Sequence, residues 1–126
     1  MIYTKETRST SIPMGVININ VENKGQITII AMAGELDSIS SPEAQEQIFP
    51  LIQHGCKILL DMTDVTYMSS AGLRTLLLMY RQIQDHVGDV VITGWGDEVR
   101  DVMAITGFLD FFHTVNSRHE GLQQLS

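Results

Sequence analysis

Two adjacent serines, Ser69 and Ser70, occupy a position where a hydroxyl can serve as a nucleophile, a phosphate acceptor or a helix cap. They follow a polar segment and precede a run with helical spacing, so they lie at the start of a predicted helix. The free N–H groups and the dipole of a first helical turn favour an anion, but they equally favour a serine that only caps the helix. Ala71 and Gly72 are small enough to leave this turn open to a partner, and Arg74 is spaced to reach a phosphate on Ser70. The local pattern therefore leaves two interpretations open, a cap alone or a modification site.

A small serine hydrolase is the first enzymatic alternative. Its nucleophile would occupy a G-x-S-x-G turn between a strand and a helix. Residues 68–72 are Met-Ser-Ser-Ala-Gly, which lacks the first glycine, and no histidine is obviously placed to activate the hydroxyl. Hydrolase chemistry is therefore the less favoured hypothesis.

Metal ions and nucleotide cofactors are not expected either. The histidines lie at predicted helix ends or near the C-terminus, without the close spacing of metal ligands: His54, His86, His113 and His119. No G-x-x-x-x-G-K-[ST] phosphate loop occurs, and Gly94-Trp95-Gly96 lacks the third glycine of a dinucleotide fingerprint. The sequence predicts a non-enzymatic protein without a cofactor.

The composition of the chain limits the classes of partner that it is expected to bind and the cellular compartment in which it is expected. With 126 residues, 44% of them hydrophobic, the chain has the size of one domain with one core. Its formal net charge is −7 and its 8 Lys and Arg residues are scattered, so direct binding to nucleic acid is not expected. The single Cys56 suits a reducing compartment. The sequence lacks both an apolar signal region and the roughly 20 apolar residues that span a bilayer, which predicts a cytoplasmic protein without membrane contact.

Hydrophobic patterning predicts strands that alternate with helices after a flexible N-terminal tail at residues 1–13. Strands are expected at residues 16–21, 26–32, 57–62 and 90–93, with a last short one within 108–115. Asn23-Lys24-Gly25 joins the first two as a hairpin. The segment after residue 62 is polar and is predicted to be a loop that leads into the helix behind Ser70.

Helix signals fill the gaps between these strands. Ser40-Ser41-Pro42-Glu43 has a serine at the N-cap, a proline in the first turn and a glutamate that could complete a capping box, and Pro50 should shorten this helix. Asp97 is a second predicted cap. Helices are expected at residues 41–54, 71–86 and 97–106, with a terminal turn at 120–125. The order predicts a single α/β domain at residues 14–126, with a mixed sheet of four to five strands and three to four helices.

Three segments, in the same order and spacing, resemble the STAS domain and in particular the bacterial anti-sigma factor antagonists. Val65-Thr66-Tyr67-Met68-Ser69-Ser70-Ala71-Gly72-Leu73 is similar to the signature of that family, and Gly34-Glu35-Leu36-Asp37 is similar to its G-E-L-D segment. Thr106-Gly107-Phe108-Leu109 resembles the exit of its third helix. The resemblance covers roughly residues 15–117 and implies the STAS fold for nearly the whole domain.

The resemblance also implies a function. A STAS antagonist of this type binds an anti-sigma factor that is a serine kinase, and phosphorylation of the antagonist abolishes binding until a PP2C-type phosphatase restores it. The family's phosphate acceptor falls on Ser70, while Ser69 stands where the family usually has aspartate and is the competing acceptor. The implied partner surface centres on Asp37, Ser69, Ser70, Gly72 and Arg74. The alternative within the family is a scaffold or transport-complex module that works without phosphorylation.

Three acidic residues near this surface keep more than one interpretation. Asp37 is either a partner contact or a turn former before the helix that starts near Ser40. Asp61 and Asp64 are expected mainly to shape the predicted loop by accepting hydrogen bonds.

Overall fold

The predicted N-terminal hairpin is confirmed in the computed structural model, which describes residues 16–107 and 109–126. Its strands pair antiparallel, and Gly25 between them has the positive φ of 62° that suits a tight turn. The predicted tail at residues 1–13 lies outside the described residues. The division of the chain into a tail and a domain at 14–126 therefore stays a prediction.

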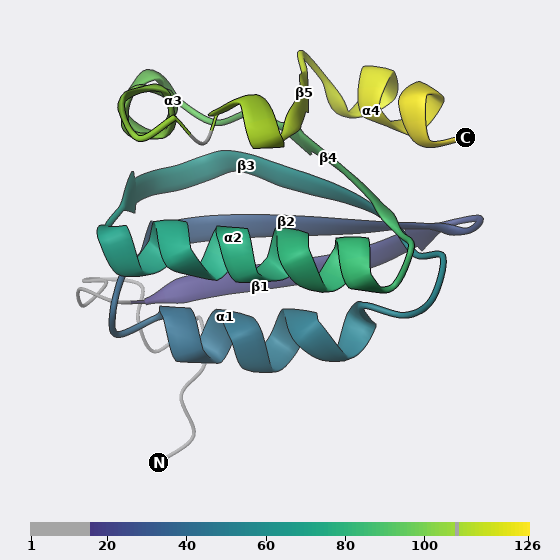
Figure 1. Ribbon diagram of the computed structural model, residues 1–126, viewed down its shortest axis with the longest axis horizontal. Helices are drawn as coiled ribbons and strands as arrows, with labels where there is room; N and C mark the ends of the chain where they lie inside the picture. The colour runs from purple at the N-terminus through teal and green to yellow at the C-terminus, as the bar shows by residue number, and fades with distance from the viewer. Residues whose placement is uncertain (1–15, 108) are drawn as a thin grey trace.

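Within the described residues, five strands form one sheet in the order β1-β2-β3-β4-β5, and every pair after the hairpin is parallel. The strands are β1 (Ile17–Lys24), β2 (Ile27–Leu36), β3 (Lys57–Met68), β4 (Asp89–Thr93) and β5 (His113–Val115). The helices are α1 (Ser41–Ile48), α2 (Ser70–Asp85), α3 (Asp97–Ile105) and α4 (Arg118–Leu125), with 3-10 turns η2 (Phe49–Leu51) and η3 (Leu109–Phe111). This mixed sheet with its helices confirms the predicted α/β class (Figure 1).

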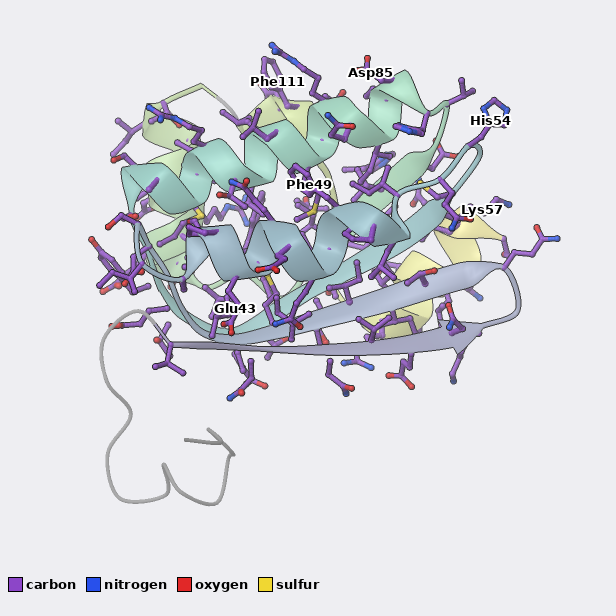
Figure 2. The ribbon with its side chains drawn as sticks, turned by 90° about the horizontal axis from the view of Figure 1, so that it is seen from below. Glu43, Phe49, His54, Lys57, Asp85 and Phe111 are labelled. Atoms are coloured by element: carbon purple, nitrogen blue, oxygen red, sulfur yellow. The ribbon has the colours of Figure 1, made fainter. Side chains whose placement is uncertain are left out.

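The helices cover the two faces of the sheet unequally. α1, α2 and α3 contribute to one large apolar core, in which Leu60 of β3 and Leu76 of α2 are almost fully buried. Figure 1 shows α1 and α2 side by side along the sheet, and Figure 2 shows Phe49 between them. Because side chains alternate between the faces of a strand, Leu59 points to the other face, where it forms a smaller cluster with Leu125 of α4.

β3 is longer than the sequence indicates. We expected a strand at residues 57–62 followed by a loop, but the strand continues to Met68. Its register with β2 shifts twice, so that β3 gains an extra residue after Asp61 and another after Val65. Each bulge resets the alternation of side chains, and the buried residues Met62, Val65 and Met68 therefore recur at every third position. The predicted loop was wrong because this spacing does not match the period of a regular strand.

Of the two predicted helix caps, Ser40 is confirmed at the N-cap position of α1, but without a side-chain capping bond, and Asp97 was wrong. The Ser40 side chain makes no capping bond to α1, because its Oγ donates to the Glu35 carbonyl oxygen at 2.6 Å and accepts from the Asp37 N–H at 3.0 Å. Asp97 is the first residue of α3, whose N-cap is Gly96. A serine at the N-cap position therefore need not form a capping bond when a neighbouring turn competes for its hydroxyl, as at Ser40.

The C-terminal segment contains less strand and more helix than expected. The strand predicted within residues 108–115 is confined to β5. The predicted terminal turn is a complete helix, α4, which begins at Arg118 because the Oγ of Ser117 accepts a hydrogen bond from the Glu120 N–H at 3.1 Å.

Charge also holds α4 on the sheet. Arg118 donates from Nε to Asp61 Oδ2 at 2.7 Å and from Nη1 to Glu22 Oε1 at 2.8 Å. The Thr63 N–H donates to Asp61 Oδ1 at 2.9 Å. Burial alone would raise the pKa of Asp61, but the hydrogen bonds from Thr63 and Arg118 outweigh it and hold the pKa below its ordinary value of 3.8. Asp61, which we expected to shape a loop, thus links β3 to α4.

Replacing Asp61 by asparagine should lower the free energy of unfolding near neutral pH by about 1–3 kcal/mol, because Arg118 loses a charged hydrogen-bond partner. The folded-state pKa is depressed, so this contribution is present above the ordinary value of 3.8 and is lost as the pH falls through the lower folded-state pKa. Urea unfolding of the wild type and Asp61→Asn at a series of pH values measures it. A stability difference that stays constant down to the acid limit would contradict the assignment.

Candidate partner-binding site

The predicted functional residues lie at the carboxyl ends of two neighbouring parallel strands. β2 ends at Leu36 and leads toward α1, and β3 ends at Met68 and leads into α2. The Ser69 N–H donates to the Leu36 carbonyl oxygen at 3.0 Å, which joins the two exits. Gly72 is buried against the same oxygen, with which a Cβ at this position would collide. The missing side chain is thus required by packing and does not open the turn as we expected, so the contribution of Gly72 to partner binding stays a prediction.

The two serines have different structural roles. Ser69 is the N-cap of α2, and its Oγ accepts a hydrogen bond from the Gly72 N–H at 3.3 Å. Ser70 is the first residue of the helix and is exposed. The sequence could not separate the two hydroxyls, whereas the structure gives the cap to Ser69 and leaves Ser70 toward solvent.

Asp37 lies next to this junction but is buried. Only 7% of the residue is exposed, and its Oδ1 accepts hydrogen bonds from the Ile39 N–H at 2.9 Å and the Ser40 N–H at 3.0 Å. These bonds close the loop between β2 and α1 in the manner of an Asx turn. Asp37 therefore has the turn-forming role that was one of its two interpretations, and its role as a partner contact stays a prediction.

The exposed side chains of α2, of β3 and of the loop after β2 differ in character. Arg74 is exposed one helical turn after Ser70, at a spacing that lets the two side chains meet. Two large hydrophobic side chains are also open to solvent, Ile39 at 67% and Tyr67 at 46%. Asp64 on β3 is exposed as well. The exposed side chains of this end of β3, of the loop after β2 and of the first turns of α2 therefore include a cation, an anion and apolar area.

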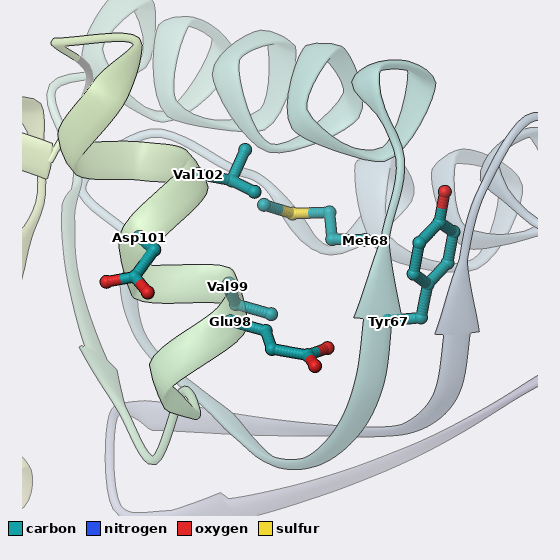
Figure 3. A pocket seen from close by; sticks show the side chains of 6 residues that line it. All are labelled: Tyr67, Met68, Glu98, Val99, Asp101 and Val102. Carbon is teal, nitrogen blue, oxygen red and sulfur yellow. The ribbon is translucent and has the colours of Figure 1, made fainter.

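A pocket beside the serines was missed by the sequence analysis. Its volume is about 330 Å³, and the lining residues come from the end of β3 and from α3: Tyr67, Met68, Glu98, Val99, Asp101 and Val102 (Figure 3). No local pattern reveals it, because the two elements are far apart in the sequence and meet only in the folded sheet. The acidic residues near the start of α3 were the one visible signal.

The described part of the chain offers few side-chain arrangements that would support other chemistries. Within residues 16–107 and 109–126, no group of three or more His, Cys, Asp or Glu is arranged to hold a metal ion. The His86 ring contacts the Gln82 carbonyl oxygen, and the His113 ring contacts the Gln124 side chain. Neither contact involves Ser69 or Ser70. None of the helices in these same residues has the length and apolar character needed to cross a bilayer.

Residues 18–121 match the STAS domain, and the chain therefore belongs to the STAS domain family. The match spans the hairpin, the parallel strands and the junction around Ser69 and Ser70. It confirms the resemblance that the segments at residues 34–37 and 65–73 indicated.

Two relatives have names that describe a regulatory role. The chain is 32% identical over 91 residues to BtrV of Bordetella bronchiseptica, named as a candidate anti-sigma factor antagonist, in an alignment that covers 71% of this chain and 78% of BtrV. It is 26% identical over 105 residues to the anti-sigma-B factor antagonist of Bacillus subtilis, covering 83% of this chain and 95% of that protein.

Solved structures show the same fold at lower identity. An anti-sigma factor antagonist from Mycobacterium paratuberculosis superposes with a TM-score of 0.78 at 20% identity, covering 88% of this chain and 95% of the other. The Bacillus cell fate determinant SpoIIAA in its phosphorylated form gives a TM-score of 0.68 at 18% identity, covering 86% of this chain and 100% of the other.

Gly72→Ala should destabilise the protein by about 1–3 kcal/mol, because the added Cβ meets the backbone of Leu36, which cannot move aside as a side chain can. The matched control is Gly96→Ala, where a Cβ meets nothing within 4 Å and the loss should stay below about 1 kcal/mol. Thermal and urea unfolding compare them. Equal losses in both variants would contradict the packing role of Gly72.

The two serines should differ in their effect on stability. Ser69→Ala removes the cap of α2 and should cost about 1 kcal/mol, whereas Ser70→Ala replaces an exposed first-turn hydroxyl and should change stability by less than about 0.5 kcal/mol. Chemical denaturation of both variants measures this. The assignment of the cap would be overturned by a larger loss in Ser70→Ala than in Ser69→Ala.

Proposed function

We propose that this chain is an anti-sigma factor antagonist that binds an anti-sigma factor with serine kinase activity, and that phosphorylation of Ser70 switches this binding off. The observation that carries the proposal is the exposed Ser70 at the first position of α2, directly after a serine already used as the cap. The names of the relatives support the antagonist role. The phosphorylated form of SpoIIAA supports the idea that this fold accepts such a modification.

The geometry favours Ser70 over Ser69 as the acceptor. Phosphorylation of Ser69 would place the bulky anion on the oxygen that accepts the Gly72 N–H, and it would disturb the turn joined to Leu36. Phosphorylation of Ser70 would leave that bond in place. The N-terminal dipole of α2 and the exposed Arg74 would then stabilise the new charge.

The switch follows from the chemistry of transfer. A kinase that modifies Ser70 must present the γ-phosphate of ATP to the Ser70 Oγ, which gains the phosphoryl group while its proton leaves and ADP forms. The phosphoserine carries about −1.5 to −2 charges near neutral pH. It then faces the remaining phosphates of the bound nucleotide, which carry the same sign. Repulsion and the desolvation of the phosphoserine should therefore weaken the complex, with little change in the fold. A phosphatase of the PP2C type, which hydrolyses the phosphate, would restore binding.

The test is incubation of the purified chain with ATP and an extract of the source cells, followed by intact-mass measurement and peptide mapping. We expect one phosphate on the wild type, on the peptide that contains Ser70, and none on Ser70→Ala. Ser69→Ala is the matched control and should still be modified. A phosphate on Ser69, or at a site outside this pair, would overturn the assignment.

Binding should follow the charge at position 70. Ser70→Ala should bind the kinase as the wild type does, and Ser70→Asp should bind it about tenfold or more weakly, since like charges across an interface are strongly unfavourable. Calorimetry or surface plasmon resonance measures both. Equal affinities of the two variants would refute the switch.

A different outcome of this test would favour the alternative function within the STAS family, a module that works without phosphorylation. If the chain forms a stable complex but is never phosphorylated, it works as a scaffold or transport-complex module without a phosphorylation switch. The serine at position 69, where the family resemblance leads us to expect aspartate, is the observation that keeps this candidate open.

A further inference from the structure

The pocket between β3 and α3 adjoins the candidate modification site directly. Tyr67 and Met68, which form one of its walls, are the two residues before the capping Ser69. The opposite wall is α3, and Figure 3 shows Val99 and Val102 of this helix facing the Met68 side chain. One wall of the pocket thus leads directly into the turn that carries Ser70.

The inside of the pocket is apolar. Met68 and Val99 are 5% and 3% exposed and form its floor, with the half-buried Val102 above them. Its volume of about 330 Å³ is large enough for one leucine, methionine or phenylalanine side chain. Such a side chain would gain by leaving water.

The rim of the pocket is acidic. Glu98 and Asp101 are both exposed, and neither takes part in an ion pair among the residues that the structure describes. The helix dipole explains Asp97 and Glu98 in the first turn, but it does not explain Asp101 one turn later. Asp101 is spaced to repel both Asp97 and Glu98, which is unfavourable for an isolated helix. These carboxylates are therefore available to meet positive charge on another molecule.

We propose that this pocket and its acidic rim are a second contact for the kinase partner, and that they receive an apolar side chain flanked by Lys or Arg residues of that partner. The inference rests on the proposed function, because it supposes that a kinase docks at Ser70. In this inference α3 and the end of β3 help to recognise the kinase, whereas phosphorylation of Ser70 controls whether the kinase stays bound. Charge complementarity selects a basic segment, and the neighbouring Ser70 surface places it in the same interface.

The experiment uses the kinase that phosphorylates the wild-type chain, purified from the source cells by that activity. Its affinity is measured by surface plasmon resonance for the wild type and for the charge-reversal variant Glu98→Lys/Asp101→Lys at two ionic strengths. At low salt we expect the variant to bind roughly tenfold or more weakly, mainly through a slower association rate, and at high salt we expect the difference to shrink to about threefold or less. Val102→Phe, which fills the pocket, should weaken binding at both salt concentrations.

The matched control is Asp85→Lys/Asp89→Lys, which changes the net charge equally at the C-terminal end of α2 and the start of β4. This control should keep wild-type affinity within about twofold, and thermal unfolding should show that all variants are folded. Wild-type affinity in both the charge-reversal and the Val102→Phe variants overturns the inference and leaves the proposed function intact. An equal loss in the Asp85→Lys/Asp89→Lys control also overturns it, because net charge alone would then account for the effect. If no kinase modifies or binds the wild type, the proposed function fails and the inference fails with it.

Discussion

The Leu36 carbonyl oxygen connects the two halves of the candidate site. It accepts the Ser69 N–H, and it occupies the space in which residue 72 would otherwise carry a side chain. Because Leu36 ends β2 and Ser69 follows the last residue of the parallel strand β3, this contact fixes where α2 begins relative to the sheet. The position of Ser70, the residue after Ser69, is fixed with it.

Structural support and the proposed modification fall on different, neighbouring residues. Ser69 and Gly72 hold the first turn of α2, and Asp37 holds the adjacent loop. Ser70 is left free for the proposed modification, at a helix end whose dipole tolerates an anion. A phosphate can therefore alter the surface without breaking a bond on which the fold depends. That division explains how one residue of the chain could control binding while the sheet beneath it stays unchanged.

The order of the elements was predictable from the sequence, but the details of the site were not. Buried runs such as residues 90–93 and the helical spacing after Ser70 identified the α/β class correctly. The sequence predicted only the first half of β3, because two bulges give the buried residues of its second half a spacing of three. Residue preferences at helix ends could not tell whether Ser69 or Ser70 caps α2. The choice depends on the contact between the Ser69 N–H and the Leu36 carbonyl oxygen, which forms only in the folded sheet. The pocket and the link from Asp61 to Arg118 join elements distant in sequence, which local patterns do not report.

The central claim is that phosphorylation of Ser70 changes a binding surface and not the fold. Amide hydrogen–deuterium exchange, measured on the chain before and after modification by its kinase, tests it most directly. We predict that altered exchange is confined to the first turn of α2 and the adjoining loop after β2, with unchanged protection in β2, β3 and β4. Loss of protection across these strands would contradict the account, because the modification would then act by unfolding the domain.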